Sequence, residues 1–437
     1  MSIKVVKFGG SSLSEAKQFK KVYEIIKADP SRRFVVPSAP GKRFDNDTKV
    51  TDMLYNCYEL ASTGKEYEPV FQQIKSRYNE IIEELGLELS LDEEFDIIKG
   101  AFLHKAGRDY AASRGEYLNG IILAKYLDFE FIDAAEVIFF NENGTFADER
   151  TNSVLRERLS RIEYAVIPGF YGSMPNDTIK TFSRGGSDVT GSIVARAAMA
   201  NLYENWTDVS GFMVVDPRIV KNPATIGTIT YRELRELSYM GATVLHEDAI
   251  FPVRKGQIPI NIRNTNKPDE DGTMIVYTSD KTNENVVTGI AGKKGFSVIN
   301  LEKDRMNSEI GFGRRVLEVI EENGISFEHL PSGIDTMSII VSSASVEGKE
   351  KKLLDDILMA VHPDKVDIET GLALIAIVGR GMKNSKGTAA KLINAVAEAK
   401  INIKMIDQGS SEMNIILAVN EYDFESAIKC IYNAFFE

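Results

Sequence analysis

The feature that most constrains the fold is an alternation of short β-rich stretches with longer helical stretches over residues 1–280. The β-rich stretches include "RRFVVPS", "DFEFID", "YAVIPGF" and "IPINIRN", and helical stretches such as "LDEEFDIIKGAFLHKAG" and "SVLRERLSRI" lie between them. Parallel strands cannot be joined by tight turns and need long crossover connections, which are usually helices. The alternation therefore predicts a layered α/β domain around a mostly parallel sheet.

An internal repeat follows the polar segment at residues 264–285. Aligning Gly311 with Gly387 gives an offset of 387 − 311 = 76, and the same offset places Ile339 on Ile415. Each copy has the pattern of an amphipathic helix, a strand, a glycine turn and an alternating strand, followed by a second helix. The repeat predicts two paired modules.

Composition excludes several classes of protein. The chain has 437 residues, a formal net charge of −12 and 43% hydrophobic residues, with no basic run of the kind that binds nucleic acid. No apolar run approaches the roughly 20 residues of a membrane span, and the N-terminal stretch lacks a signal-peptide core. Cys57 and Cys430 are the only cysteines, and the four histidines lack metal-ligand spacing. We expect a cytoplasmic protein without membrane or nucleic-acid partners and without a protein metal site.

The stretch "IKVVKFGGSS" at residues 3–12 is the first candidate for chemistry. It predicts a strand, a glycine turn and a helix over residues 11–27 that Ser11 or Ser12 caps. A glycine turn before a helix lets backbone amides approach an anion, and Lys7 adds a full charge. An equally good interpretation is a tight turn with Lys7 on a solvated edge.

A second glycine turn lies in "TFSRGGSDVTGSIV", where Ser187 or Asp188 is placed to cap the following helix. Arg184 can bind a carboxylate or phosphate bidentately, and Asp188 can orient Lys7. Alone, this turn is best explained as an ordinary helix start. Together with the first turn, it favours a nucleotide-phosphate site built from two opposed turns.

A third polar segment, "NWTDVSGFMVVDPRIV", contains Thr207, Asp208, Asp216 and Arg218. Ligands of open α/β sheets lie beyond the carboxyl ends of the strands, so this segment is a candidate nucleotide contact or a plain loop. The P-loop, protein-kinase and dinucleotide fingerprints are missing, so any kinase chemistry must use another fold.

Five motifs taken in order resemble those of the aspartate kinases of the amino-acid kinase superfamily. They are "KFGGSSL", "SRGE" at 113–116, "SRGGSD", "TDVSGFMVVDPR" and "GATVLHEDAI". The repeated modules resemble the paired ACT regulatory domains of that family. The resemblance implies an α/β fold with a three-layer amino-acid kinase domain at 1–280. Two ferredoxin-like βαββαβ ACT modules follow within 281–437, at about 295–365 and 370–437, with strand 286–291 a candidate to complete the second.

The resemblance also implies an activity and a set of site residues. The activity is transfer of the ATP γ-phosphoryl group, with Mg²⁺, to L-aspartate, giving 4-phospho-L-aspartate on the route to lysine, threonine and methionine. The implied catalytic residues are Lys7 and Asp188. The implied substrate-binding residues are Ser38, Thr51, Glu116, Arg184 and Ser187. The implied nucleotide-binding residues are Lys7, Gly9, Gly10, Ser11, Thr207, Asp208, Met213, Asp216, Arg218 and Thr243.

Regulation by an amino acid is the further implication. L-Lysine is the favoured effector and threonine the alternative, bound where modules pair in a homodimer or homotetramer. An effector ammonium needs an acceptor and its carboxylate needs amides. The expected pocket residues are Met306, Ser308, Gly311, Phe312 and Glu328 of the first module with Ser411 and Glu412 of the second.

Three alternative functions are weighed against this one. Another amino-acid kinase, acting on glutamate or acetylglutamate, would share the glycine turns but is not expected to carry both "SRGE" and the doubled module. A non-catalytic amino-acid sensor predicts a damaged Lys7 or Asp188, and both are present. A nicotinamide-dependent enzyme would need the dinucleotide fingerprint.

Overall fold

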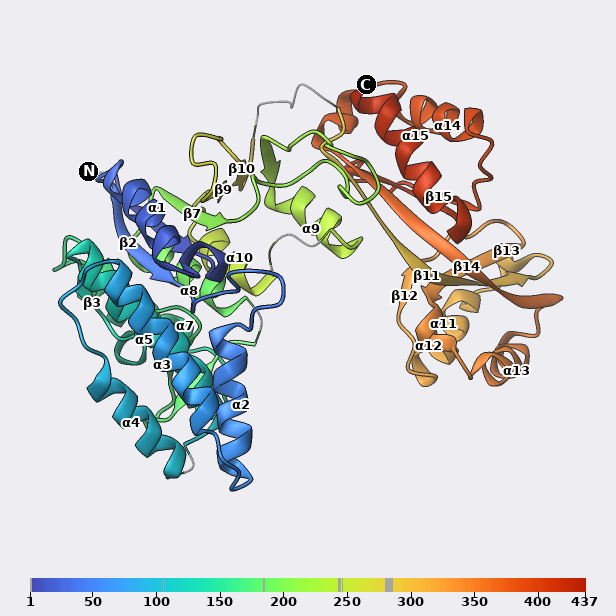
Figure 1. The fold of residues 1–437 in the computed structure, drawn as a ribbon. Coiled ribbons are helices and arrows are strands. Elements are labelled where there is room, and N and C mark those ends of the chain that lie inside the picture. The colour runs from blue at the N-terminus through green and yellow to red at the C-terminus, as the bar shows by residue number, and fades with distance from the viewer. Residues whose placement is uncertain (1, 105, 184, 243–244, 246, 280–285) are drawn as a thin grey trace. The chain divides into compact units, whose positions relative to one another are not determined.

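The computed structural model describes residues 2–104, 106–183, 185–242, 245, 247–279 and 286–437 (Figure 1). The chain forms two compact units. Unit 1 comprises 1–212, 225–231 and 244–279, and unit 2 comprises 213–224, 232–243 and 280–437. Two short segments that precede residue 280 in the sequence therefore belong to unit 2.

Unit 1 is built on an eight-stranded sheet in which the only antiparallel pair among the described strands is β9 with β10. This confirms the predicted, mostly parallel sheet. In sheet order the strands are β3 (Glu130–Phe131), β4 (Ala165–Val166), β2 (Arg32–Pro37), β1 (Lys4–Phe8), β7 (Leu202–Thr207), β9 (Ile260–Asn264), β10 (Thr273–Val276) and β8 (Thr228–Thr230). A separate hairpin joins β5 (Tyr171–Ser173) to β6 (Ile179–Thr181).

Helices cover both faces of this sheet. The described helices of unit 1 are α1 (Ala16–Lys27), α2 (Val50–Ser62), α3 (Glu68–Glu84), α4 (Asp92–Leu103), α5 (Arg108–Leu127), α6 (Ala134–Val137), α7 (Asp148–Leu159), α8 (Gly186–Ala197) and α10 (Glu247–Lys255). Val6 and Phe8 of β1 belong to the hydrophobic core that this strand forms with α1 to α5. Helix α8 also contacts β1. Successive strand residues point to opposite faces, so Lys7 points away from that core.

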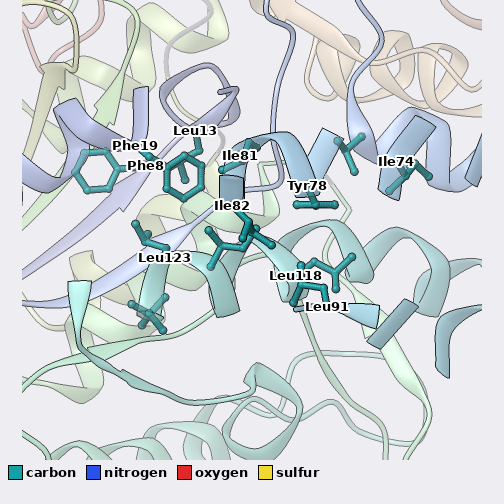
Figure 2. Packing of buried hydrophobic residues seen from close by; sticks show 14 of the residues in the cluster. Phe8, Leu13, Phe19, Ile74, Tyr78, Ile81, Ile82, Leu91, Leu118 and Leu123 are labelled. Atoms are coloured by element: carbon teal, nitrogen blue, oxygen red, sulfur yellow. The ribbon is translucent and has the colours of Figure 1, made fainter. Parts of the chain in front are cut away.

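The core on the α1–α5 side is shown in Figure 2. Phe8 and Leu13 meet Phe19 of α1, and Tyr78 and Ile81 come from α3. Burying a side chain of this size stabilises the fold by about 1.5–3 kcal/mol. Tyr78 is the polar member of this group, and its hydroxyl donates to the Gly115 carbonyl at 2.7 Å.

The first predicted helix is wrong at its start. Residues 10–13 form a 3₁₀ turn, η1 (Gly10–Leu13), and α1 begins only at Ala16, after Glu15. The Ser12 hydroxyl shares a hydrogen bond of 2.8 Å with the Thr265 hydroxyl and caps no helix. The polar GGSS stretch is therefore a separate loop beside the sheet.

Unit 2 contains a six-stranded sheet whose described strand pairs are all antiparallel. In sheet order the strands are β12 (Phe327–His329), β13 (Thr336–Ser342), β11 (Gly289–Glu302), β14 (Lys365–Val378), β16 (Asn414–Asn420) and β15 (Met405–Asp407). The described helices of this unit are α9 (Tyr231–Tyr239, whose first residue belongs to unit 1), α11 (Phe312–Glu322), α12 (Ser343–Val346), α13 (Glu350–Val361), α14 (Thr388–Glu398) and α15 (Phe424–Phe436).

The two modules share the long strands β11 and β14. Residues 289–294 of β11 pair with 373–378 of β14, which also pairs with β16, while the second half of β11 pairs with β13. Gly295 and Gly371 lie where each strand passes between modules, at φ +93° and +78°, and 371 − 295 = 76 repeats the sequence offset. A Cβ added at either glycine would have no neighbouring atom within 4 Å, so backbone conformation rather than space requires glycine there.

No helix in the described part of the chain has the length and apolar character needed to cross a membrane.

Candidate active site

The cation of the first motif is buried at the end of β1. Lys7 is 7% exposed, and its Nζ lies 2.6 Å from Oδ1 of Asp188 in the first turn of α8. The same oxygen accepts a hydrogen bond of 2.9 Å from Nδ2 of Asn205 in β7, the strand residue paired with Lys7. The two predicted catalytic residues are thus brought together, and the solvated-edge interpretation of Lys7 is wrong.

Asn205 is a site residue that sequence reasoning missed. It is 4% exposed within the otherwise buried stretch "YENW" of β7. A buried side-chain amide in a central strand needs a hydrogen-bond partner. An asparagine within a buried strand was therefore the sequence signal that could have identified this site residue.

The first glycine turn lies directly beside Lys7. The Gly9 amide donates to the Trp206 carbonyl at 3.0 Å, and a Cβ on Gly9 would lie 3.5 Å from Nζ of Lys7. A Cβ on Gly10 would lie 2.8 Å from the Ala39 carbonyl oxygen, which is closer than real contacts allow. The turn therefore needs glycine because two backbone segments approach each other, and Ser11 follows within η1.

The second glycine turn begins α8 without a side-chain cap. The N-cap is Gly185, at φ 59°, so the predicted capping by Ser187 or Asp188 is wrong. Asp188 instead contacts Lys7. Ser187 is 8% exposed, and a Cβ on Gly169 would lie 2.7 Å from its hydroxyl oxygen. Arg184 lies outside the described residues.

The "SRGE" motif occupies the interior of α5, so Glu116 lies more than one turn after the start of this helix. Arg114 is buried between the rings of Tyr117 and Tyr110, 4.4 and 4.6 Å from their centroids, and serves packing. A Cβ on Gly115 would lie 2.8 Å from that of Ala39, so this glycine lets the helix reach the loop after β2.

Glu116 is a buried acid with an unused acceptor. The residue is 5% exposed, and its Oε2 is buried without a hydrogen-bond partner. Burial raises the pKa of Glu116 to about 8, although the Ala39 amide, the Ser187 hydroxyl and the charge of Lys7 all act to lower it. An ammonium group placed at Oε2 would satisfy that oxygen and restore the charge.

Asn119 lies one turn after Glu116 on the same face of α5 and was also missed. It is fully buried, and its Oδ1 has no partner. Its Nδ2 donates to the Ser38 carbonyl at 2.7 Å. Glu116 and Asn119 are three residues apart, so they lie on the same face of the helix. Two polar residues at this spacing in an otherwise apolar helix were a sequence signal for a common polar site.

Hydrogen bonds define the position of Ser38 relative to the other predicted site residues more clearly than that of Thr51. Ser38 follows β2, and its amide donates to the Phe8 carbonyl at 3.0 Å, so it lies next to the first glycine turn. Thr51 is half-buried in the first turn of α2. Within the described residues, no side-chain hydrogen bond ties Thr51 to the other predicted site residues.

A cavity of about 640 Å³ opens beside the second glycine turn. Ser183 and Val189 line it next to Arg184 and Asp188 in the sequence, together with Arg108, Lys180 and several phenylalanines. Asp109 also lines the cavity and pairs with Lys180 at 3.1 Å, so the lining contains two cations and one anion.

The predicted nucleotide residues of the third motif divide between the two units. The Thr207 hydroxyl donates to Oδ1 of Asp208 at 3.1 Å, and both residues belong to unit 1. Met213, Asp216 and Arg218 belong to unit 2, where Asp216 pairs with the exposed Arg218 at 2.6 Å. That hydrogen bond lowers the pKa of Asp216. Thr243 lies outside the described residues.

The predicted effector residues are spread over both modules of unit 2. Met306 and Phe312 are buried in the core of the first module, and Gly311, at φ 79°, precedes α11. Ser308 is exposed, and Glu328 accepts a hydrogen bond from the Tyr239 hydroxyl. Ser411 and Glu412 follow β15, and no hydrogen bond within the described residues joins them to the other set. The effector pocket stays a prediction.

The site residues fit a magnesium ion that arrives with a nucleotide. Within the described residues, no group of three or more His, Cys, Asp or Glu side chains is placed to hold a metal. Mg²⁺ at phosphate-transfer sites is commonly held by the phosphates and one or two carboxylates, and Asp188 supplies such a carboxylate beside Lys7.

The chain is similar to known proteins over nearly its whole length. The model of the Amino acid kinase family matches residues 2–264, and an ACT domain model matches 375–435. The chain is 40% identical to Aspartokinase 3 of Bacillus subtilis over 99% of both chains. The crystal structure of Clostridium acetobutylicum aspartate kinase is 52% identical and covers 100% of both chains with a TM-score of 0.89.

More distant structures share the fold. E. coli aspartokinase III matches over 100% of both chains with a TM-score of 0.71, at 23% identity in its complex with aspartate and ADP and 24% in its complex with lysine and aspartate. The glycine turns, the Lys7–Asp188 pair and these matches lead to one conclusion. The chain belongs to the aspartokinases of the amino acid kinase family.

Proposed function

We propose that this enzyme transfers the γ-phosphoryl group of ATP to the side-chain carboxylate of L-aspartate to give 4-phospho-L-aspartate. The observation that carries the proposal is the buried Lys7–Asp188 pair beside Glu116, whose Oε2 has no partner. Lys7, held by Asp188, supplies a fixed cation for a phosphoryl group. Oε2 of Glu116 supplies a hydrogen-bond acceptor for an amino group.

The acceptor carboxylate needs no general base. A side-chain carboxyl with an ordinary pKa of about 3.9 is already ionised at neutral pH. The obstacle to reaction is repulsion between two anions, so positioning and positive charge carry the catalysis. Lys7 is placed to stabilise charge on the transferring group, and the glycine turn that begins at Gly9 lies beside it. Bound Mg²⁺ would supply further charge neutralisation on the phosphates.

Substrate recognition is assigned to the surrounding polar residues. Glu116 accepts from the substrate ammonium, Arg184 binds the α-carboxylate, and Ser38, Thr51 and Ser187 donate hydrogen bonds. The nucleotide contacts of Thr207, Asp208, Met213, Asp216, Arg218 and Thr243 remain part of this proposal. Arg184→Ala is expected to raise the KM for aspartate while leaving the KM for ATP within about threefold.

An ADP-release assay with a panel of amino acids tests the substrate. ADP release should depend on L-aspartate. Glutamate or N-acetylglutamate as the preferred acceptor would favour the alternative of another amino-acid kinase.

The regulatory part of the proposal is feedback inhibition through unit 2, in a cytoplasmic homodimer or homotetramer. We favour L-lysine as the effector, with threonine as the alternative, and place the enzyme at the first step towards lysine, threonine and methionine. We test lysine before threonine because E. coli aspartokinase III has been crystallised in complex with lysine and aspartate. The catalytic domain is assigned to 1–280 and the regulatory region to 281–437.

A further inference from the structure

One buried cation of unit 1 has no part in the site described above. Arg77 lies on α3, and its side chain is 3% exposed. A leucine or methionine would fill the same space without a desolvation cost, so a guanidinium at this position calls for an explanation.

Arg77 contacts two loops that are distant in the sequence. Its Nη2 donates to the Ser14 carbonyl at 3.1 Å and to the Gly41 carbonyl at 2.6 Å, and its Nε lies 3.3 Å from the Ser14 carbonyl. Ser14 ends the loop that contains Gly9 and Gly10. Gly41 lies in the loop that Ser38 begins.

The two loops also contact each other directly. The Gly41 amide donates to the Gly10 carbonyl at 2.8 Å. A Cβ on Gly41 would lie 2.6 Å from the Gly10 carbonyl carbon, and a Cβ on Gly10 would lie 3.1 Å from the Gly41 nitrogen. Neither loop can move relative to the other without breaking these contacts or those of Arg77.

Asp47 supplies the countercharge. Nη1 of Arg77 lies 2.8 Å from its Oδ2, and Asp47 also accepts from the amide of Arg43 at 2.9 Å. These partners hold the pKa of Asp47 well below its usual range, whereas burial lowers the pKa of Arg77. Asp47 belongs to the same loop as Gly41, so the ion pair fixes the far end of that loop to α3.

We propose that Arg77 is a positioning residue for phosphoryl transfer, which ties the phosphate-side loop at Gly9–Ser14 to the acceptor-side loop at Ser38–Asp47. This inference rests on the site assignments of the proposed function. The forked guanidinium is suited to the task because it bonds two carbonyls and a carboxylate at once, which an ammonium cannot match in geometry. A misplacement of about 1 Å between reacting groups can cost on the order of 10²-fold in rate.

The test compares Arg77→Ala with Lys75→Ala. Lys75 is on the same helix and pairs at 2.6 Å with Asp92, the first residue of α4. We expect Arg77→Ala to lower kcat by about 10- to 100-fold with both KM values within threefold, and Lys75→Ala to stay within twofold of wild type. Guanidinium chloride should restore part of the lost kcat of Arg77→Ala, measured against sodium chloride at equal ionic strength.

The kcat of each variant is normalised to the fraction of folded enzyme, which circular dichroism measures. A kcat of Arg77→Ala within threefold of wild type per folded molecule would overturn the inference, as would a loss that resides only in KM. If Arg77→Ala does not fold, the kcat and KM of Arg77→Lys test the inference instead. A kcat loss of at least fivefold at unchanged KM supports positioning, and full activity contradicts it. A wild-type enzyme without aspartate-dependent ADP release would instead overturn the proposed function, so the two failures are distinguishable.

Discussion

Lys7 Nζ lies 2.6 Å from Oδ1 of Asp188, so the first strand and the first turn of α8 meet in one ion pair. Asn205 donates to the same oxygen from the neighbouring strand. The lysine is thereby held in one orientation before any substrate binds. Such preorganisation is how a fixed charge lowers the barrier for phosphoryl transfer.

Replacing Lys7 with alanine should lower kcat by on the order of 10²-fold or more, with a smaller effect on the KM for aspartate. The reason is loss of the cation that the proposed mechanism assigns to the transferring group. Lys20→Ala, at an exposed position of α1, is the matched control and should retain wild-type turnover. Steady-state ADP release measures both, and near-normal turnover of the Lys7 variant would remove this residue from the mechanism.

Aspartate binding should strengthen as the pH rises towards 8. Because the pKa of Glu116 is raised to about 8, the empty site holds a proton on this carboxyl at neutral pH. Only the ionised form attracts the substrate ammonium, so the KM for aspartate should fall by up to about tenfold per pH unit below 8 and level off above it. Initial rates between pH 6 and 8.5 give this profile.

Thermal unfolding checks the same titration without catalysis. The folded free enzyme binds this proton more tightly than the unfolded chain, so the contribution of Glu116 to stability is lost as the pH rises from its ordinary pKa of 4.5 to about 8. The increase in Tm on adding aspartate should therefore grow with pH. Glu116→Gln should raise the KM and abolish the pH dependence, and a Gln variant with the wild-type profile would contradict the assignment.

L-Lysine should inhibit the full chain at millimolar concentration, with a coupling of about 1–3 kcal/mol between effector and substrate sites. Glu412→Ala should shift the inhibition curve to higher lysine, and so should a change at Ser308. Titrations with lysine and threonine compare the two effectors. Insensitivity of the full chain, or unmoved curves in both variants, would rule out the pocket as assigned.

A buried ion pair should govern the stability of unit 2. Glu233 is fully buried, and its two oxygens accept from the Arg380 amide and Nη1, each at 2.8 Å. Glu233→Gln weakens this pair and should destabilise the unit by about 3 kcal/mol. Glu425→Gln, which breaks the half-exposed pair with Lys294, should change stability by less than about 1 kcal/mol. Urea unfolding followed by circular dichroism compares them, and equal effects would contradict this account.

The sequence predicted much of the fold because its patterns are local. Alternating β-rich and helical stretches predicted the parallel sheet, and the offset of 76 predicted the repeated modules. The start of α1 was predicted wrongly because Ser11 and Ser12 have the composition of a cap, while Ser12 bonds Thr265 far along the chain. No local pattern contains that partner.

The same limit applies to the candidate site. Lys7 and Asp188 could be predicted from two glycine turns and are paired in the structure. Asn205 and Asn119 were missed because the sequence shows an amide within an apolar element but does not show its partner, which is Asp188 for Asn205 and the Ser38 carbonyl for Asn119. Arg77 was missed for the same reason, since nothing in α3 indicates that its cation faces two loops.

The most direct test of the central claim is to trap the product with hydroxylamine, which converts an acyl phosphate into a hydroxamate, and to measure it by mass spectrometry alongside ADP. We predict one aspartate β-hydroxamate per ADP released, dependent on both ATP and L-aspartate and strongly reduced in Lys7→Ala. ADP release without the hydroxamate, or a hydroxamate of another amino acid formed in preference, would contradict the account.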